Sequence, residues 1–199
     1  MSKIFVVMGK SATGKDTIFN EMKDKLRDQV KTVIGYTTRP IRDGETNGVA
    51  YYFVHRDKLS EYDKNGKIIE QRSYDTVYGV WDYFTVDDGQ INLVESNYIM
   101  LGTLESFKQI KDYYGEDKVL PIYLEVEDGL RLERALKRER MQINPKYKEL
   151  CRRYLADEED FCEENLMRLN IKKRYNNQNM NQCLLEILTD IKTIISFQQ

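Results

Sequence analysis

The sequence predicts a three-layer α/β fold in which a parallel sheet lies between helices and carries a β-rich insertion and a helical flap. Three observations predict it. The chain begins with a strand, a glycine loop and a helix; an aromatic β-rich stretch interrupts the middle; and strand–helix alternation then resumes. With 199 residues, 41% of them hydrophobic, the chain is long enough for one substantial core bearing small lobes.

The N-terminal elements are the clearest. Residues 3–8 form a short apolar run with β-branched members, which is typical of a buried parallel strand. After the glycine loop at residues 9–17, apolar residues recur at helical spacing from Ile18 to Leu26. Residues 31–36 predict a second strand.

The middle of the chain predicts an inserted lobe. Residues 40–50 are rich in Gly, Asp, Asn and Pro and indicate a loop. Three β-like runs follow at 51–54, 67–70 and 81–86, with no strand–helix alternation between them.

Alternation returns in the second half. The sequence predicts a strand at 97–101, a helix from Leu104 to Tyr114 ended by Gly115, and a strand at 119–124. Two helices at 128–141 and 146–167 and an amphipathic helix at 180–196 complete the chain.

Composition excludes several classes of protein. A net charge of −2 and a pI near 5.7 provide no global attraction to nucleic acid or anionic membrane. Three scattered cysteines and one histidine argue against a zinc site or a disulfide framework. Without an apolar run near 18 residues or a signal peptide, we expect a cytoplasmic protein.

The glycine loop carries the strongest chemical signal. Gly9 and Gly14 let the backbone curl so that N–H groups converge, the helix N-terminus adds positive charge, and Lys15 can reach β- and γ-phosphates. The position after Lys15, normally a Mg²⁺-binding Ser or Thr, is Asp16. The predicted ATP-binding loop consists of Gly9, Lys10, Ser11, Ala12, Thr13, Gly14, Lys15, Asp16 and Thr17.

Several separated motifs then resemble the guanylate kinase family. They are Thr-Thr-Arg-Pro-Ile-Arg at 37–42, the Gly-Glu to Phe-Val stretch at 44–54, Gly-Lys-Ile-Ile-Glu at 66–70 and Tyr78-Gly79. The resemblance extends to about residue 95 and weakens afterwards. It implies a P-loop kinase core at 1–36, 96–127 and 168–199, an acceptor-binding lobe at 37–95 and a lid at 128–167.

The resemblance also implies roles for individual residues. Glu70 would face the acceptor base, and Lys15, Arg39 and arginines of the lid would neutralise the transferred phosphoryl group. The lid positions that match best are Arg138 and Arg153, with Arg134 and Arg152 as substitutes. The acceptor phosphate would be bound by Arg39, Arg42, Tyr51 and the Tyr78-Gly79 motif. Asn177 falls in the segment that contacts adenine.

Three departures from the family pattern affect guanine recognition and metal binding. Serines of the family are replaced by Gly35 and Val80, and the Leu-Asp-x-Asp strand end is Met-Leu-Gly-Thr at 100–103. Since lost hydrogen-bond partners weaken base discrimination, guanine specificity stays open.

Asp16 suggests a compensation for the lost carboxylates. Our hypothesis is that Asp16 is the anionic contact to Mg²⁺, with Thr17 supplying a hydroxyl. The alternative is an Asp stabilised only by the helix dipole. The acidic run at 157–160 is interpreted as a solvated face paired with Arg152 and Arg153 rather than as a metal site.

The expected function is ATP-dependent phosphoryl transfer to a nucleoside monophosphate, with GMP to GDP favoured and Mg²⁺ as cofactor. The expected partners are therefore small nucleotides, and the oligomeric state is open. Two alternatives remain at this point: a kinase resembling ribose 1,5-bisphosphate phosphokinases, and a non-catalytic guanylate-kinase-like module that binds proteins.

Overall fold

A parallel sheet of five strands forms the centre of the molecule, in the order β2-β7-β1-β8-β9. The computed structural model describes residues 2–42, 44–76 and 79–197. The strands of this sheet are β1 Ile4–Gly9, β2 Val30–Thr32, β7 Asn97–Leu101, β8 Val119–Glu125 and β9 Arg174–Asn176. All six residues of β1 are buried, as its apolar sequence predicts for a central strand.

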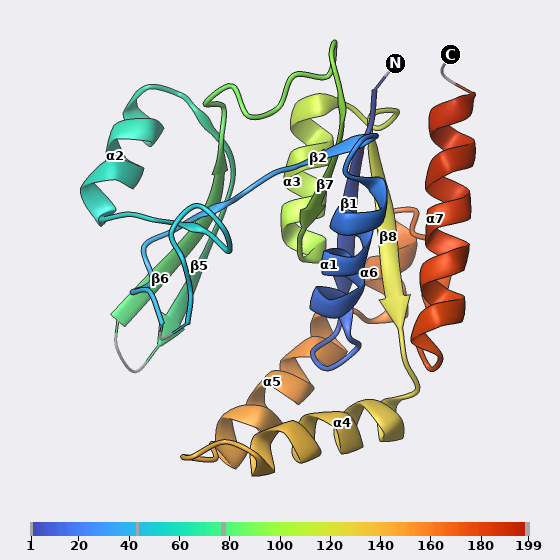
Figure 1. The fold of residues 1–199 in the computed structure, drawn as a ribbon. Helices are drawn as coiled ribbons and strands as arrows, with labels where there is room; N and C mark the ends of the chain where they lie inside the picture. The colour runs from blue at the N-terminus through green and yellow to red at the C-terminus, as the bar shows by residue number, and fades with distance from the viewer. Residues whose placement is uncertain (1, 43, 77–78, 198–199) are drawn as a thin grey trace.

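Helices cover both faces of this sheet, which confirms the predicted three-layer fold (Figure 1). One face packs Phe5 and Val7 of β1 against α1 Lys15–Leu26 and α7 Met180–Ser196. The other packs the alternate residues of β1 against α3 Leu104–Tyr114 and α6 Glu163–Arg168. Because side chains alternate along a strand, the apolar strand β1 contributes side chains to the cores on both faces of the sheet.

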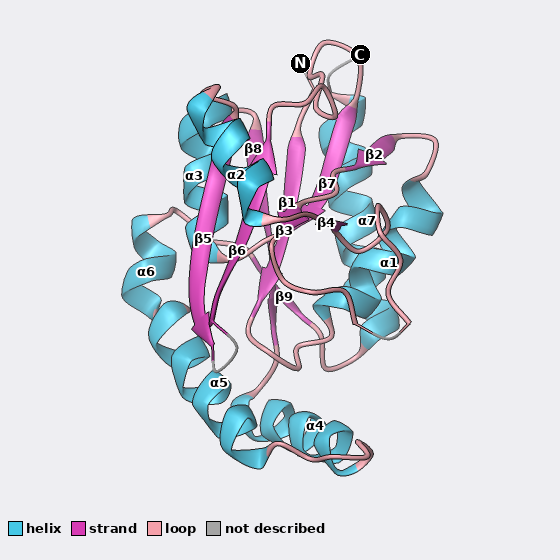
Figure 2. Ribbon diagram, turned by 90° about the vertical axis from the view of Figure 1, so that its left-hand side faces the viewer, coloured by secondary structure: helices cyan, strands magenta, loops and turns pink. Residues whose placement is uncertain are grey.

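A second sheet of four strands, in the order β4-β3-β6-β5, forms a separate lobe with α2 Arg56–Lys64 (Figure 2). Its strands are β3 Tyr36–Thr37, β4 Tyr52–Phe53, β5 Ile68–Thr76 and β6 Gly79–Val86. The lobe has a small core of its own, consisting of Tyr36, Leu59, Phe84 and Val86. On the β5–β6 ladder, the one tryptophan of the chain, Trp81, lies opposite Tyr74.

Two helices, α4 Asp128–Arg140 and α5 Tyr147–Asp160, form a flap beside the end of the central sheet where β8 finishes (Figure 1). The carboxylate of Glu127 caps α4 by accepting from the backbone N–H groups of Gly129 and Leu130, both at 2.8 Å. No helix in the described part of the chain is long and apolar enough to cross a bilayer.

Some predicted elements differ from the structure. The strand expected at 31–36 is wrong, because β2 joins the central sheet while β3 joins the lobe. The helix expected at 146–167 is broken at Phe161, which is buried and stacks on Tyr123. Neither α2, with one buried residue, nor the polar β9 was predicted, because neither carries a hydrophobic period.

Candidate active site

The glycine loop between β1 and α1 is a tight turn that requires glycine at two positions, Gly9 and Gly14. A Cβ on Gly9 would lie 2.7 Å from the Leu124 carbonyl oxygen and 2.8 Å from Thr13 Oγ1. Gly14 has φ +83° and caps α1, where a side chain would be strained. Helix α1 begins at Lys15, so its unpaired N–H groups and the positive end of its dipole lie at the loop. This is the geometry of an anion site.

Asn177 lies behind this loop and holds it. Its side chain is 3% exposed, and Nδ2 donates to the Thr13 carbonyl at 2.7 Å. Its Oδ1 has no hydrogen-bond partner among the described residues. The Arg134 guanidinium donates to the backbone carbonyls of Asn177 (3.1 Å) and Gln178. The structure therefore places Asn177 as a support of the loop and Arg134 next to the segment before α7.

One cavity of about 610 Å³ joins the loop to the β-rich lobe. It contains most of the predicted acceptor residues and the start of α1. The predicted site residues that line it are Lys15, Asp16, Arg39, Arg42, Tyr51 and Glu70. The strand end at 100–103 lines it too. Thr17 and Gly79 are exposed and do not line it. Tyr78 lies outside the described residues.

Arg39 is locked against Glu45 inside this cavity. Its Nη1 and Nη2 donate to the two carboxylate oxygens at 3.0 and 2.8 Å, and its side chain is 3% exposed. Glu45 also accepts from the backbone N–H of Arg42 at 2.8 Å. The Arg39 hydrogen bonds hold the pKa of Glu45 below its usual range. Arg39 is thus fixed in position, while Arg42 is exposed and also lines the cavity.

Glu70 is locked in a similar way by Arg72. Glu70 Oε2 accepts from Arg72 Nε at 2.9 Å, and Oε1 accepts from Arg72 Nη2 at 3.3 Å and Thr85 Oγ1 at 2.9 Å. Glu70 is 2% exposed, and Arg72 lines the cavity beside it. Burial disfavours the charged form of Arg72, but Glu70 outweighs it and raises the Arg72 pKa. The negative charge of Glu70, the residue predicted to bind the acceptor base, is therefore already balanced by Arg72.

The arginines predicted for the lid are not gathered at the cavity. Arg138 and Arg153 line neither this cavity nor a second one of about 630 Å³ between the end of β8 and the flap. Arg152 and Arg153 pair with Glu149, at 2.7 and 3.7 Å. The interpretation of the 157–160 run as paired with these two arginines is wrong.

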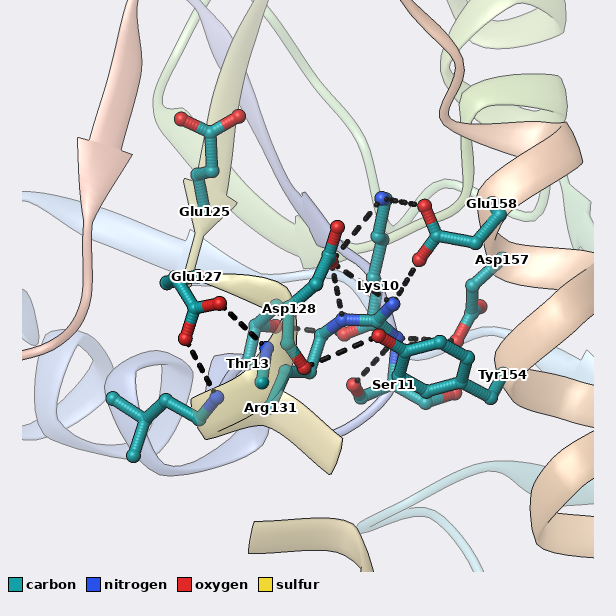
Figure 3. A network of polar contacts seen from close by, with 12 residues as sticks. Lys10, Ser11, Thr13, Glu125, Glu127, Asp128, Arg131, Tyr154, Asp157 and Glu158 are labelled. Atoms are coloured by element: carbon teal, nitrogen blue, oxygen red, sulfur yellow. Dashed lines mark hydrogen bonds and ion pairs between the residues drawn. The ribbon is translucent and has the colours of Figure 1, made fainter. Parts of the chain in front are cut away.

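The acidic run contacts the glycine loop instead (Figure 3). Asp157 Oδ2 accepts from the backbone N–H of Ser11 at 2.8 Å. Glu158 Oε2 accepts from Lys10 Nζ at 2.6 Å, and Asp128 Oδ1 lies 3.6 Å from the same ammonium. Helix α5 thus places two carboxylates directly on the loop.

Arg131 is the centre of this network. Its side chain is 0% exposed and bonds Asp128 at 3.1 Å, with Asp157 at 3.6 Å and Glu158 in direct contact. Its guanidinium carbon lies 3.9 Å from the centre of the Tyr154 ring. A buried charge is tolerated only with such partners, so Arg131 joins α4, α5 and the loop into one unit.

Asp16 fits a metal contact better than Thr17. Its side chain is 71% exposed in the first turn of α1 and lines the cavity, and carboxylate oxygens suit Mg²⁺. Among the described residues there is no cluster of three or more His, Cys, Asp or Glu able to hold a metal. Mg²⁺ often takes only one or two carboxylates, with phosphates and water as its other ligands.

Sequence reasoning missed the partners of the residues it selected. Arg72 stands two residues after Glu70 on the same strand face, and Asp128 stands one turn before Arg131. Those spacings were visible in the sequence. The docking of Asp157 and Glu158 on the loop was not, because 146 and 148 residues separate the bonded pairs.

Comparisons with known proteins agree on one family. A family model described as guanylate kinase matches residues 1–83. A guanylate kinase of Clostridioides difficile is 39% identical over 77 residues, covering 38% of this chain and 37% of the relative. One of Nostoc sp. is 28% identical over 135 residues, covering 65% of each. The chain thus matches less than two thirds of these relatives' length.

The fold likeness extends further than the sequence likeness. The crystal structure of guanylate kinase from Anaplasma phagocytophilum aligns with a TM-score of 0.66 at 20% identity, covering 96% of this chain and 85% of that one.

Proposed function

We propose that this chain acts as a guanylate kinase relative, which its N-terminal match to that family supports. It would transfer the γ-phosphoryl group of ATP to a nucleoside monophosphate, with GMP as the favoured acceptor. The observation that carries the proposal is the 610 Å³ cavity. It joins Lys15 and Asp16 of the glycine loop to Arg39, Arg42 and Tyr51 of the lobe. A donor phosphate and an acceptor phosphate can therefore meet in one cavity.

The proposed mechanism is positioning and charge neutralisation, because phosphoryl transfer asks for little covalent chemistry. The loop N–H groups and the α1 dipole would bind the donor phosphates. Lys15 would follow the moving phosphoryl group. Arg42 would bind the acceptor phosphate, since its guanidinium is exposed at the cavity and matches phosphate geometry.

Arg39 would act by position. Its two Nη groups are engaged by Glu45, so it supplies fixed positive charge to the cavity rather than a movable clamp. The pair keeps that charge oriented before any ligand arrives.

Mg²⁺ is proposed as the cofactor, with Asp16 as its protein contact. The ion would neutralise phosphate charge and orient the donor. Thr17 does not line the cavity, so Asp16 carries this proposal alone.

Lid arginines are proposed to join the site by a movement of the flap. Arg134 already lies beside the loop segment at Asn177 and is the better placed of the candidates on α4. Arg138 and Arg153 would need the flap to close.

Three free cysteines support the proposal of a cytoplasmic, reducing compartment.

A coupled ADP-release assay tests the function. GMP, dGMP, AMP, UMP, CMP, dTMP and ribose 1,5-bisphosphate are offered with ATP and Mg²⁺. We expect turnover with a nucleoside monophosphate. Lys15→Met should lower kcat by about a hundredfold or more, because it removes the positive charge that stabilises the negatively charged transition state. Lys25→Met, on the exposed side of α1, is the matched control and should keep full activity. Activity on the sugar phosphate alone would contradict the proposal.

The metal contact is tested separately with Asp16→Asn and Asp16→Ser. If Asp16 contacts the ion, the Mg²⁺ concentration that gives half-maximal rate rises in Asp16→Asn. Asp16→Ser, which restores a hydroxyl, recovers part of the loss. An unchanged Mg²⁺ requirement in both variants rejects Asp16 as the contact.

A further inference from the structure

We propose that Arg72, rather than Glu70, reads the acceptor base, and that it selects the carbonyl-and-ring-nitrogen edge shared by guanine and hypoxanthine. The proposal rests on the proposed kinase function and names the substrate class more closely: 6-oxopurine nucleoside monophosphates, with or without a 2-amino group. It starts from the Arg72–Glu70 ion pair, whose two residues line the 610 Å³ cavity.

The Glu70 carboxylate has little capacity left. It can accept about four hydrogen bonds, and three are already made: two from Arg72 and one from the Thr85 hydroxyl. Guanine read through its N1–H and 2-amino group needs two acceptors side by side. Glu70 can offer those only if Arg72 leaves it.

Displacing Arg72 is costly. The Arg72 side chain is 12% exposed and that of Glu70 is 2% exposed, so both charges are largely withdrawn from water. Removing one member of a buried ion pair leaves an uncompensated charge, which is strongly unfavourable. The pair therefore stays intact while a base binds.

Arg72 retains donors that Glu70 does not use. A guanidinium carries five N–H groups, and the two bonds to Glu70 use one on Nε and one on Nη2. A third can reach the phenol of Tyr74, which lies beside it. At least two donors remain on a side chain that lines the cavity. Where a guanine-reading carboxylate was expected, this pocket presents a hydrogen-bond donor.

The cavity beside Arg72 has aromatic walls on which a base can stack. Tyr51 and Tyr83 line the cavity, with their ring centres 5.5 Å apart in an edge-to-face contact. Arginine pairs bidentately with O6 and N7 of guanine, and hypoxanthine presents the same two acceptors. Adenine presents an amino group at that position, and it would face the Arg72 donors.

The consequence is a loss of discrimination at the 2-amino group. A site that does not bond this group cannot reject a base that lacks it. We expect GMP and IMP to be used with kcat/KM values within about tenfold of each other, and AMP to be used far less well.

The test measures kcat/KM for GMP, IMP, AMP and UMP in the wild type and in Arg72→Met. Removing Arg72 frees the Glu70 carboxylate for N1–H and the 2-amino group. The GMP-to-IMP ratio should therefore rise about tenfold or more, as a charged hydrogen bond is gained. Arg27→Met, whose side chain is 80% exposed on the far end of α1, is the control for the loss of one positive charge.

Arg72→Lys keeps the proposal testable if Arg72→Met fails to fold. It retains a cation next to Glu70 but loses the planar fork, so it should weaken GMP and IMP together. A wild type that prefers GMP over IMP by a hundredfold, or that uses UMP better than either purine, overturns the inference.

Binding without ATP separates this inference from the proposed function. Calorimetric titration of GMP and IMP should give similar Kd values whether or not phosphoryl transfer occurs. Equal Kd values without turnover contradict the kinase function alone. Turnover of GMP with no detectable binding or use of IMP contradicts the Arg72 inference alone.

Discussion

At the scale of single residues, the cavity is organised by acid–base pairs made within the lobe. Arg39 is held by Glu45, and Glu70 by Arg72. Each pair fixes a charged group that would otherwise need water, so the charges of the site are set before a ligand binds.

Glu45 makes the stability of the protein dependent on pH. Its folded-state pKa lies below its usual value, chiefly because of the Arg39 hydrogen bonds. A depressed carboxylate pKa contributes stability above the unfolded-state pKa, and this is lost as the pH falls through the folded value. Glu45→Gln should therefore be destabilised at pH 7 by about 2 kcal/mol and lose less stability than the wild type below about pH 4.

Urea unfolding at pH 7, 5, 4 and 3 measures this effect. The matched control is Glu61→Gln, a carboxylate whose partner Lys58 is on the surface. Parallel pH curves for the wild type and Glu45→Gln would show that the Arg39 contact carries no linked proton.

The sequence predicted one member of each pair, Arg39 or Glu70, and missed the other. Gly9, Gly14 and Lys15 were found because the spacing of a phosphate loop is local. Glu45, Arg72 and Thr85 were not selected, because a partner is fixed by sheet register and loop conformation, which no short motif encodes.

At the scale of elements, α5 and the glycine loop are joined by charge. Asp157 accepts a hydrogen bond from the backbone N–H of Ser11, and Glu158 forms an ion pair with Lys10. The phosphates of a bound nucleotide are also anionic, so these carboxylates repel them and compete for the same donors.

Neutralising these two carboxylates should strengthen nucleotide binding. We expect the double variant Asp157→Asn, Glu158→Gln to bind ATP several-fold more tightly, by loss of this repulsion. Fluorescent-nucleotide titration at two salt concentrations measures it. Glu159→Gln, an exposed neighbour on α5, is the control. Weaker ATP binding in the double variant would show that the contact organises the loop for the nucleotide.

Elements with a strong hydrophobic period were predicted well, and short polar ones were not. The predicted bounds of β7 and α3 agree with the structure because apolar spacing and the Gly115 stop define them. The break between α5 and α6 depends on Phe161 packing against Tyr123, which is a contact between segments. The helix propensity of one segment cannot predict a contact with another segment.

At the scale of the whole molecule, stability comes from cores of unequal size. The two faces of the central sheet bury extensive apolar clusters, whereas the apolar cluster of the lobe has four buried residues. We infer that the lobe opens at a lower free energy than the sheet.

Two matched phenylalanines test this inequality, since Phe84 and Phe107 are each 1% exposed. Phe84→Ala should cost about 3–5 kcal/mol locally and expose the β3, β5 and β6 amides to hydrogen exchange. Phe107→Ala, on the buried face of α3, should lower protection throughout the central sheet. Uniform loss of protection in both variants would mean that the lobe and sheet unfold as one unit.

The position of Trp81 gives this molecule a built-in optical reporter. It is the one tryptophan of the chain, two residues before Tyr83 and therefore on the face of β6 that lines the cavity. Light at the long-wavelength edge of protein absorption excites this side chain almost alone. Its emission should respond to ligand binding in the lobe and to movement of α5, because Asp160 of α5 acts electrostatically on Tyr74, which lies opposite Trp81. Both events can therefore be timed in a stopped-flow instrument without attaching a dye.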